Sequence, residues 1–367
     1  MLASAGVAAP PRAPNLHGNR QNPAGTRRRR AGQRFAGGAP ARGPLLAVLD
    51  LGTNNCRLLI AAPVAPRSGA EPEFKVVDSF SRIVRLGEGV GQTGLLSEAA
   101  LDRTIAALKV CADHIARHKV VRARAIATQA ARLAGNSDVL VARARAEAGI
   151  ELDVISSEEE ADLAALGCAP LIGRRYKGAL VFDIGGGSTE IIWLVEGPQG
   201  LQKRLMVSVP VGVVTLAEQF GERAASRAGF GAMRAAMHDL FAPFAAQTGT
   251  DFDPAEFHLL GTSGTVTTLA AIALGLPRYN RSRVDASWHE TARMLQVVDD
   301  LAGMDQAGLA AIGSIGAERA DLMLPGCAIF AAICALWPSP MLRVADRGLR
   351  EGMLRQLADS LVPEKTP

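Results

Sequence analysis

Three scarcities narrow the classes of protein to which this chain can belong. Aromatic residues make up 4% of the 367 residues, with two tyrosines and three scattered tryptophans, so no stacking surface for nucleic acid is expected. The five cysteines form no CxxC pair, which favours buried free thiols in a reducing cytoplasm. No run reaches the roughly 18 apolar residues of a membrane helix. We therefore expect a cytoplasmic protein that does not span a membrane.

Acidic residues are missing from the first 44 positions, which hold eight of the 40 lysines and arginines. This segment is rich in Ala, Gly, Pro and Arg and shows no apolar periodicity, which predicts a disordered tail rather than a secretory signal. A solvated tail, or a start codon placed too far upstream, is favoured over contact with nucleic acid. The other 32 basic and 36 acidic residues make the rest of the chain mildly acidic. An anionic ligand must therefore be held by local geometry.

Apolar patterning predicts that the folded chain begins at residue 45 and contains one structural unit twice. LLAVLDLG at 45–52 is typical of a buried strand that ends in a turn, and two more strands precede a helix at 97–118 capped by Ser97. Short strands then alternate with helices, one of them at 137–148. From residue 178 the segment GALVFDIGGG begins the same order again. The pattern predicts an α/β fold built by internal duplication.

Each repeat opens with a strand, an aspartate and a glycine-rich turn, DLGTNN at 50–55 and DIGGGS at 183–188. Such turns expose backbone N–H groups that bind phosphate oxygens. A carboxylate there, Asp50 or Asp183, would repel a bare phosphate but suits Mg²⁺, which needs only one or two carboxylates. A third glycine loop, LLGTSGT, follows at 259–265. The alternative is a pair of ordinary hairpins whose aspartates cap turns, and the repetition argues against it.

The three loops resemble those of the actin, sugar-kinase and heat-shock chaperone ATPase superfamily. Within it, the chain is similar to the exopolyphosphatase / guanosine pentaphosphate phosphatase family. That likeness rests on RLGEGVGQTGLLSEAAL at 85–101, on the stretch from ATQAARL to ISSEEEADL at 127–163, and on RVADRGLREGML at 343–354. The resemblance implies two ribonuclease-H-like domains, at 45–170 and 171–348, with a cleft between them. A terminal helix within 349–367 is expected to pack back on the first domain.

The resemblance implies that Glu160, in ISSEEEA, is the catalytic glutamate, and that Arg132, in TQAAR, is the active-site arginine. Ser157 stands where the family has glycine. From the residues alone, Ser157 and Glu160 fit a capping box, and three acids in a first helical turn suit the helix dipole. Ser156 is an equally good N-cap. The sequence therefore leaves two interpretations of Glu160, catalysis and capping.

Activity and cofactor follow from the resemblance, which implies hydrolysis of a terminal phosphoanhydride with Mg²⁺. Asp183, with Asp50, is expected to hold the metal, while Glu160 deprotonates a water and Arg132 makes a bidentate contact to the phosphate. The predicted phosphate-binding residues are Gly52, Thr53, Asn54, Gly185, Gly186, Gly187, Ser188, Gly264 and Thr265. The candidates for binding a chain substrate are Arg278, Arg281 and Arg283, whose alternative is a solvated basic loop.

Polyphosphate and guanosine pentaphosphate both present a terminal phosphoanhydride, and the sequence does not rank them as substrates. Two other functions stay open: an ATP-dependent phosphotransferase or switch of the same superfamily, and a regulator that binds (p)ppGpp or polyphosphate without turnover. Longer relatives carry a further C-terminal helical domain, which we expect this chain to lack. Chain-length preference and homodimerisation stay open as well.

Overall fold

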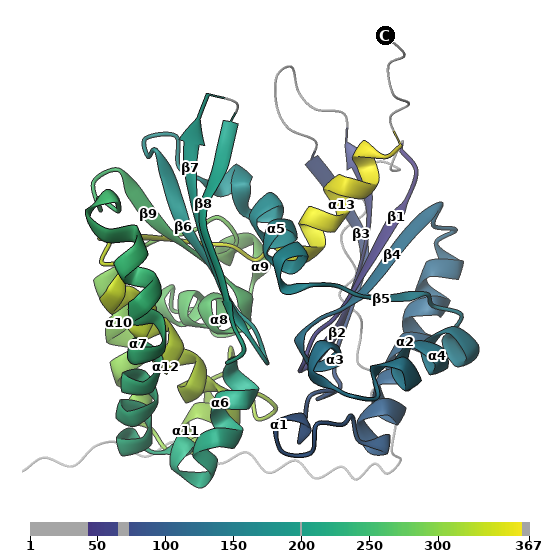
Figure 1. Cartoon of the computed structure of the whole chain (residues 1–367), viewed down its shortest axis with the longest axis horizontal. Helices are drawn as coiled ribbons and strands as arrows, with labels where there is room; N and C mark the ends of the chain where they lie inside the picture. Colours follow the sequence, from purple (N-terminus) through teal and green to yellow (C-terminus); the bar gives the residue numbers. More distant parts are fainter. Residues whose placement is uncertain (1–42, 65–72, 199, 362–367) are drawn as a thin grey trace, which may run out of the picture. The chain divides into compact units, whose positions relative to one another are not determined.

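The computed structural model describes residues 43–64, 73–198 and 200–361, which carry two β-sheets with helices packed against them (Figure 1). The strands are β1 (Leu46–Leu51), β2 (Asn55–Val64), β3 (Glu73–Ile83), β4 (Arg122–Ala127), β5 (Leu152–Val154), β6 (Gly178–Ile184), β7 (Thr189–Gly197), β8 (Gly200–Val209), β9 (Phe257–Thr262), β10 (Trp288–Glu290) and β11 (Met341–Val344). The α-helices are α1 (Val90–Thr93), α2 (Glu98–Arg117), α3 (Gln129–Leu133), α4 (Ser137–Ala148), α5 (Ser157–Cys168), α6 (Val213–Phe220), α7 (Arg227–Thr248), α8 (Ser263–Ala273), α9 (Arg281–Val284), α10 (Thr291–Ala302), α11 (Gln306–Ala311), α12 (Ala320–Leu336) and α13 (Leu349–Asp359). Short 3₁₀ turns are η1 (Ala169–Leu171), η2 (Gly221–Ala225) and η3 (Gly249–Asp251).

The two sheets repeat one strand order, so the predicted α/β fold with internal duplication is confirmed. The first sheet runs β3-β2-β1-β4-β5 and the second β10-β11-β9-β6-β7-β8. Strands β6 to β8 thus repeat β1 to β3, β9 and β11 take the places of β4 and β5, and β10 adds an edge. In both sheets the opening strand is antiparallel to its hairpin partner and parallel to the strand on its other side.

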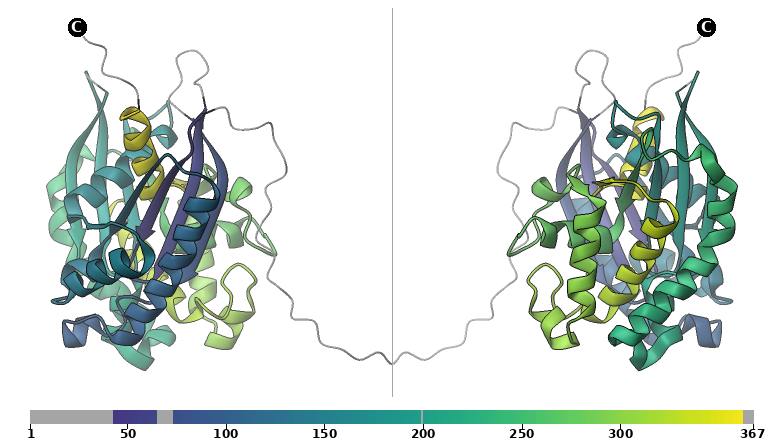
Figure 2. Two further views of the ribbon diagram at one scale, coloured as in Figure 1. Left: turned by 90° about the vertical axis from the view of Figure 1, so that its right-hand side faces the viewer. Right: turned by 90° about the vertical axis from the view of Figure 1, so that its left-hand side faces the viewer.

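Helices α2 and α4 cover one face of the first sheet through a core that includes Leu49, Leu101 and Leu108 (Figure 2). Helix α2 begins after Ser97, whose hydroxyl accepts the Ala100 N–H at 3.2 Å, as the sequence predicts. Helix α4 occupies the predicted range, and Gly149 ends it in the left-handed region with φ of 65°. All five cysteines are free and buried, which confirms that prediction.

Helices α5 and α13 pack against each other, and each contacts a different sheet (Figure 1). Helix α13 covers β1, where Met353 and Leu354 share a buried cluster with Leu46. A Cβ on Gly352 would lie 2.0 Å from the Leu163 carbonyl oxygen, so only glycine permits this separation of the helices. Helix α5 contacts β6, β7 and β8. Helix α13, packed on α5, thereby links the two halves.

The second sheet has the larger core, in which α7, α8, α10 and α12 bury apolar side chains such as Phe182 and Phe330. The described residues form one compact unit, so the domain boundary at 170/171 stays a prediction. The predicted tail at 1–44 lies outside the described residues except for its last two positions. Among the helices that the structure describes, none combines the length and apolar character needed to cross a bilayer.

Candidate active site

The two glycine turns close with the same internal hydrogen bond. The Gly52 N–H donates to the Asn55 carbonyl at 2.9 Å, and the Gly185 N–H donates to the Ser188 carbonyl at 2.9 Å. These two predicted phosphate donors are therefore engaged within their turns. Within the two turns, the backbone N–H groups of Thr53, Asn54, Gly186, Gly187 and Ser188 have no acceptor in the described part of the chain. Successive free N–H groups of this kind form a concave anion-binding surface.

The two turns touch, although they lie in different halves of the chain. A Cβ on Gly187 would lie 2.5 Å from the Thr53 hydroxyl oxygen, and one on Gly186 would lie 3.2 Å from the Asn54 nitrogen. Glycine is needed at both positions because any side chain would push the turns apart. The structure thus brings the free donors of both halves together, as the sequence predicts for two facing turns.

Strand register places one charged residue directly opposite each predicted metal-binding aspartate. Asp50 on β1 pairs with Arg57 on β2, and Asp183 on β6 pairs with Glu190 on β7. Burial raises the pKa of Asp50, and it raises the pKa of Asp183 to about 6, while the Arg57 guanidinium lowers both. Arg57 therefore acts on the carboxylates of both halves, which shows that Asp50 and Asp183 lie close together.

Glu190 is a functional candidate that the sequence analysis missed. Its side chain is 2% exposed, and one carboxylate oxygen accepts the Ser208 hydroxyl at 2.7 Å. Burial, together with the nearby charges of Glu160 and Asp183, raises its pKa to about 8. The available signal was strand pairing, because a hairpin closed at 185–188 sets Glu190 opposite Asp183.

Glu160 points into this group of acids rather than capping its helix. The N-cap of α5 is Ser156, whose hydroxyl accepts the Glu159 N–H at 3.1 Å, so the predicted capping box of Ser157 and Glu160 is wrong. Glu159 turns outward and pairs with Arg124. The cap lies one residue earlier than that box requires, and this register aims Glu160 inward.

Arg132 holds Glu160 by charge. Its Nη1 lies 2.7 Å from Glu160 Oε2, and only 17% and 14% of the two side chains are exposed. Nη1 also donates to the Ile155 carbonyl at 3.0 Å, and the buried Glu160 Oε2 faces the guanidinium. Burial raises the Glu160 pKa to about 7 and Arg132 lowers it, while Asp50 and Asp183 raise it. A carboxylate that titrates near neutrality is suited to general-base chemistry.

Arg132 does not present a free guanidinium fork in this structure. Its Nε and Nη2 both donate to Gln129 Oε1, at 3.1 and 2.6 Å. Its Nη1 contacts the Ile155 carbonyl and Glu160. The predicted bidentate contact between Arg132 and phosphate therefore stays a prediction. Two arginines that the sequence analysis did not select, Arg57 and Arg319, lie beside the third loop.

The third glycine loop is the first turn of α8. Ser263 has a φ of 98°, a strained value for a residue with a side chain, and its buried hydroxyl has no hydrogen-bond partner. Guanidinium nitrogens of Arg319 and Arg57 lie 3.8 and 4.0 Å from where a Gly264 Cβ would stand. Thr265 packs tightly on Gly326. The loop thus places two cations beside the start of a helix, where anions are favoured.

The three arginines predicted to bind a chain substrate have different environments. Arg281 pairs with Asp346 at 3.3 Å and Glu351 at 2.8 Å, so it belongs to an ion-pair network near α13. Arg278 and Arg283 are exposed. Within the described residues, no hydrogen bond or ion pair joins the three to the glycine loops. Their role in binding substrate stays a prediction.

The oxygen donors beside the two glycine turns suit Mg²⁺, which needs few protein ligands, better than a metal whose ligands all come from the protein. No group of three or more His, Cys, Asp or Glu side chains in the described chain is arranged to hold an ion. The pair Asp183 and Glu190, with Asp50 nearby, offers hard oxygen donors, and buried oxygens of Asn54, Asn55 and Ser263 lack partners. Mg²⁺ takes one or two carboxylates and completes its shell with water and substrate phosphate.

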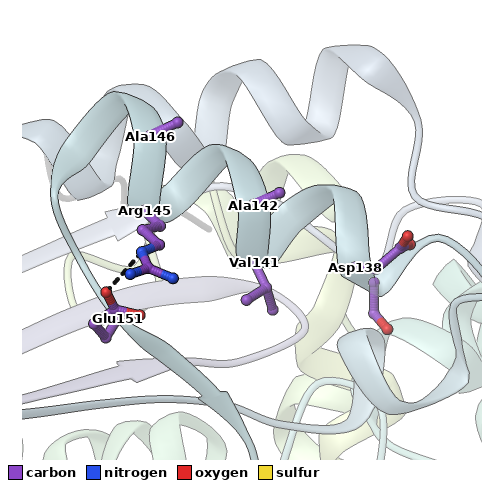
Figure 3. Close-up of a pocket in the computed structure, with 7 residues that line it drawn as sticks. Asp138, Val141, Ala142, Arg145, Ala146 and Glu151 are labelled. Carbon is purple, nitrogen blue, oxygen red and sulfur yellow. Dashed lines mark ion pairs between the residues drawn. The ribbon is translucent and has the colours of Figure 1, made fainter.

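A surface pocket over α4 is separate from these residues (Figure 3). Its lining residues are Ser137, Asp138, Val141, Ala142, Arg145, Ala146 and Glu151, and Arg145 pairs with Glu151 at 3.0 Å. None of the predicted site residues lines it. The candidate active site is therefore the group of turns and carboxylates described above.

Comparison with known proteins gives a consistent result. The model of the Ppx/GppA phosphatase family matches residues 64–361. Exopolyphosphatase 2 of Mycobacterium tuberculosis is 31% identical over 293 residues, which are 77% of this chain and 88% of that protein. Guanosine-5'-triphosphate,3'-diphosphate pyrophosphatase of Aliivibrio fischeri is 29% identical over 87% of this chain and 60% of its own, longer chain. The crystal structure of the Aquifex aeolicus Ppx/GppA family member superposes with a TM-score of 0.69 at 27% identity, covering 88% of this chain and 99% of that one.

Proposed function

Because the chain belongs to the Ppx/GppA phosphatase family, we propose that it hydrolyses the terminal phosphoanhydride bond of inorganic polyphosphate, guanosine pentaphosphate or both. The observation that carries the proposal is the environment of Glu160. This carboxylate is largely buried, has a pKa of about 7, and lies beside Arg132 near the two glycine turns. Perturbed carboxylates of this kind cluster at catalytic sites, which favours a hydrolase over a regulator without turnover.

Glu160 acts as the general base. Its carboxylate accepts a proton from a water molecule as the water oxygen attacks the terminal phosphorus. The bond between that phosphorus and the bridging oxygen breaks, inorganic phosphate is released, and the shortened chain leaves with the bridging oxygen. Arg132 keeps the carboxylate oriented and lowers its pKa. In-line displacement of this kind depends chiefly on positioning and charge stabilisation.

The glycine turns stabilise the charge on the phosphoryl oxygens. The free N–H groups of Thr53, Asn54 and 186–188 come from both halves and converge where the turns touch. Arg57 adds a positive charge near Asp50, Asp183 and the third loop. Preorganised donors of this type cost no reorganisation when charge develops.

We propose that Asp183 and Glu190, with Asp50, are the residues that would hold Mg²⁺. A bound Mg²⁺ neutralises phosphate charge and supplies Lewis-acid polarisation of the transferred group. The three carboxylates can then ionise together, which burial and mutual repulsion otherwise oppose. Their raised pKa values support this assignment.

The test is phosphate release from long polyphosphate, short polyphosphate and guanosine pentaphosphate in parallel, with and without Mg²⁺. We expect release from at least one of them, and only with the metal. Incubation with ATP and sugars serves as the control for a phosphotransferase. Binding of all three substrates without release of phosphate would contradict the hydrolase proposal.

A further inference from the structure

Gln129 occupies a central place in the candidate site for which the proposed mechanism has no role. It is the first residue of α3, two positions after the end of β4, and the residue is 7% exposed. Its amide oxygen accepts hydrogen bonds from both Nε and Nη2 of Arg132, at 3.1 and 2.6 Å. A neutral amide oxygen thus takes the fork of N–H donors that a carboxylate usually occupies in proteins.

Gln129 also packs against the second half of the chain. Its Cγ lies 3.1 Å from where a Gly187 Cβ would stand, so the methylene stem rests on the backbone of the second glycine turn. The side chain therefore has one fixed arrangement, with its stem held by Gly187 and its oxygen held by Arg132. Fixing Gln129 in this way fixes the guanidinium as well.

The neutrality of Gln129 has a chemical consequence. Arg132 is the cation closest to Glu160, and the site already contains Asp50, Asp183 and Glu190. A carboxylate at position 129 would neutralise the guanidinium and add a further negative charge near the substrate. The amide orients Arg132 and leaves its full charge available to Glu160.

We propose that Gln129 is a positioning residue, whose amide oxygen locks the Arg132 guanidinium against the general base Glu160. This inference rests on the proposed hydrolase function. Gln129 acts through Arg132, so its removal changes the chemical step and leaves substrate affinity nearly unchanged.

A double-mutant cycle tests the role of Gln129. Gln129→Met keeps the volume and removes the acceptor, and it is combined with Arg132→Met. The matched control is Gln356→Met, because Gln356 also accepts a hydrogen bond from an arginine, Arg124, at 2.8 Å, but does so on the exposed face of α13. Phosphate release at pH 8 with Mg²⁺ gives kcat and KM for each variant, and thermal unfolding gives Tm.

We expect Gln129→Met to lower kcat about 10- to 100-fold with KM changed less than about threefold. In the Arg132→Met background the same change should cost less than about twofold, since residues that act through one another are not additive. Gln356→Met should stay within about twofold of wild type. If Gln129→Met does not fold, Gln129→Ala enters the same cycle with the same expectations.

Three results would overturn the role of Gln129 while leaving the hydrolase proposal intact. These are unchanged kcat in Gln129→Met, a loss of equal size in both backgrounds, or a rise in KM with kcat preserved. The last result would make Gln129 a direct substrate contact. If wild type and Gln356→Met release no phosphate from any substrate, the proposed function fails and this inference fails with it.

Discussion

Asp183 on β6 and Glu190 on β7 face each other across antiparallel strands, beside the glycine turn that joins these strands. Cross-strand partners have Cβ atoms about 5 Å apart, and like charges at this separation destabilise a sheet. Burial adds to the cost, as the pKa values of about 6 and about 8 show. In the first sheet the equivalent pair is Asp50 and Arg57, which attract each other. The duplicated hairpins have thus diverged into one self-neutralising pair and one pair that needs a cation or a proton.

The acidic pair predicts a pH-dependent stability that Mg²⁺ relieves. Because the folded pKa values of Asp183 and Glu190 exceed their ordinary values, the folded state binds more protons than the unfolded state. The stability that these two groups contribute is therefore fully present below about pH 4 and is lost as pH rises through their folded pKa values of about 6 and about 8. At pH 8, Mg²⁺ at ten times its Kd should stabilise the fold by about 1.4 kcal/mol and raise Tm by a few degrees.

Thermal unfolding between pH 5 and 9, with Mg²⁺ or with chelator, measures this effect. Glu190→Gln should flatten the pH dependence and reduce the response to Mg²⁺. Glu196→Gln, an exposed acid on the same strand β7, is the control and should behave as wild type. An equal Mg²⁺ response in Glu190→Gln and wild type would remove Glu190 from the metal site.

Replacing Glu160 with Gln should abolish turnover and preserve binding. The amide keeps the shape of the side chain but cannot accept the proton, so kcat should fall about 10²- to 10⁴-fold with little change in KM. Glu158→Gln is the control, because Glu158 is exposed on the same helical turn. Phosphate release and equilibrium binding of polyphosphate provide the two measurements. More than a tenth of wild-type activity in Glu160→Gln would rule out its role as the base.

The pH profile should report on Arg132. The base must be ionised, so kcat/KM should rise with pH through the Glu160 pKa of about 7. Arg132→Met removes the charge that lowers this pKa. The rise of kcat/KM on the acidic side of the profile should therefore shift to higher pH by about one unit. Arg124→Met is the matched control, since Arg124 pairs with the neighbouring Glu159 and leaves Glu160 untouched. A rise that stays in place in Arg132→Met would show that another group sets it.

The contact between the glycine turns makes Gly187→Ala a test of the phosphate site. The added methyl would lie 2.5 Å from the Thr53 hydroxyl, so the turns must separate, at a cost of about 1–3 kcal/mol. We expect a raised KM as well as lower stability, because the free N–H groups no longer converge. Gly231→Ala on α7, where a Cβ meets nothing within 4 Å, should be neutral or stabilising. Urea unfolding and steady-state kinetics on both variants compare the two sites.

The capping register of α5 gives a prediction that is independent of catalysis. Ser156→Ala removes the oxygen that accepts the Glu159 N–H and should destabilise the protein by about 1 kcal/mol. Ser157→Ala, one residue inside the helix, should change stability by less than about 0.5 kcal/mol. Denaturant unfolding of the two variants distinguishes them, and the reverse order would restore the capping box of Ser157 and Glu160.

Much of the fold followed from local pattern in the sequence. The strand, aspartate and glycine turn occur twice within contiguous residues, so the duplication was predictable from the sequence pattern. Helix α2 carried a clear N-terminal signal in Ser97. The order of strands beyond the hairpins depends on crossovers, which the resemblance supplied and periodicity did not.

The sequence analysis erred at the site where the outcome depends on a shift of one residue along a helix or on which residue lies opposite in a sheet. Ser156 and Ser157 are equally good caps in sequence, and only packing of α5 on the second sheet decides between them, which turns Glu160 inward. Arg57 and Glu190 were missed because each lies within an apolar strand, where its importance depends on the residue opposite. Gln129 gave no signal at all, since its contacts involve a nearby arginine and a glycine about 60 residues away.

The placement of α13 bears on how the chain acquires its structure during synthesis. Met353 and Leu354 complete the apolar cluster over Leu46 on the first strand, about 300 residues earlier. Domains made of contiguous chain can fold as they leave the ribosome. Here one face of the first sheet stays open until α13 has been translated. The first sheet must therefore keep apolar surface exposed while the roughly 300 residues between β1 and α13 are synthesised.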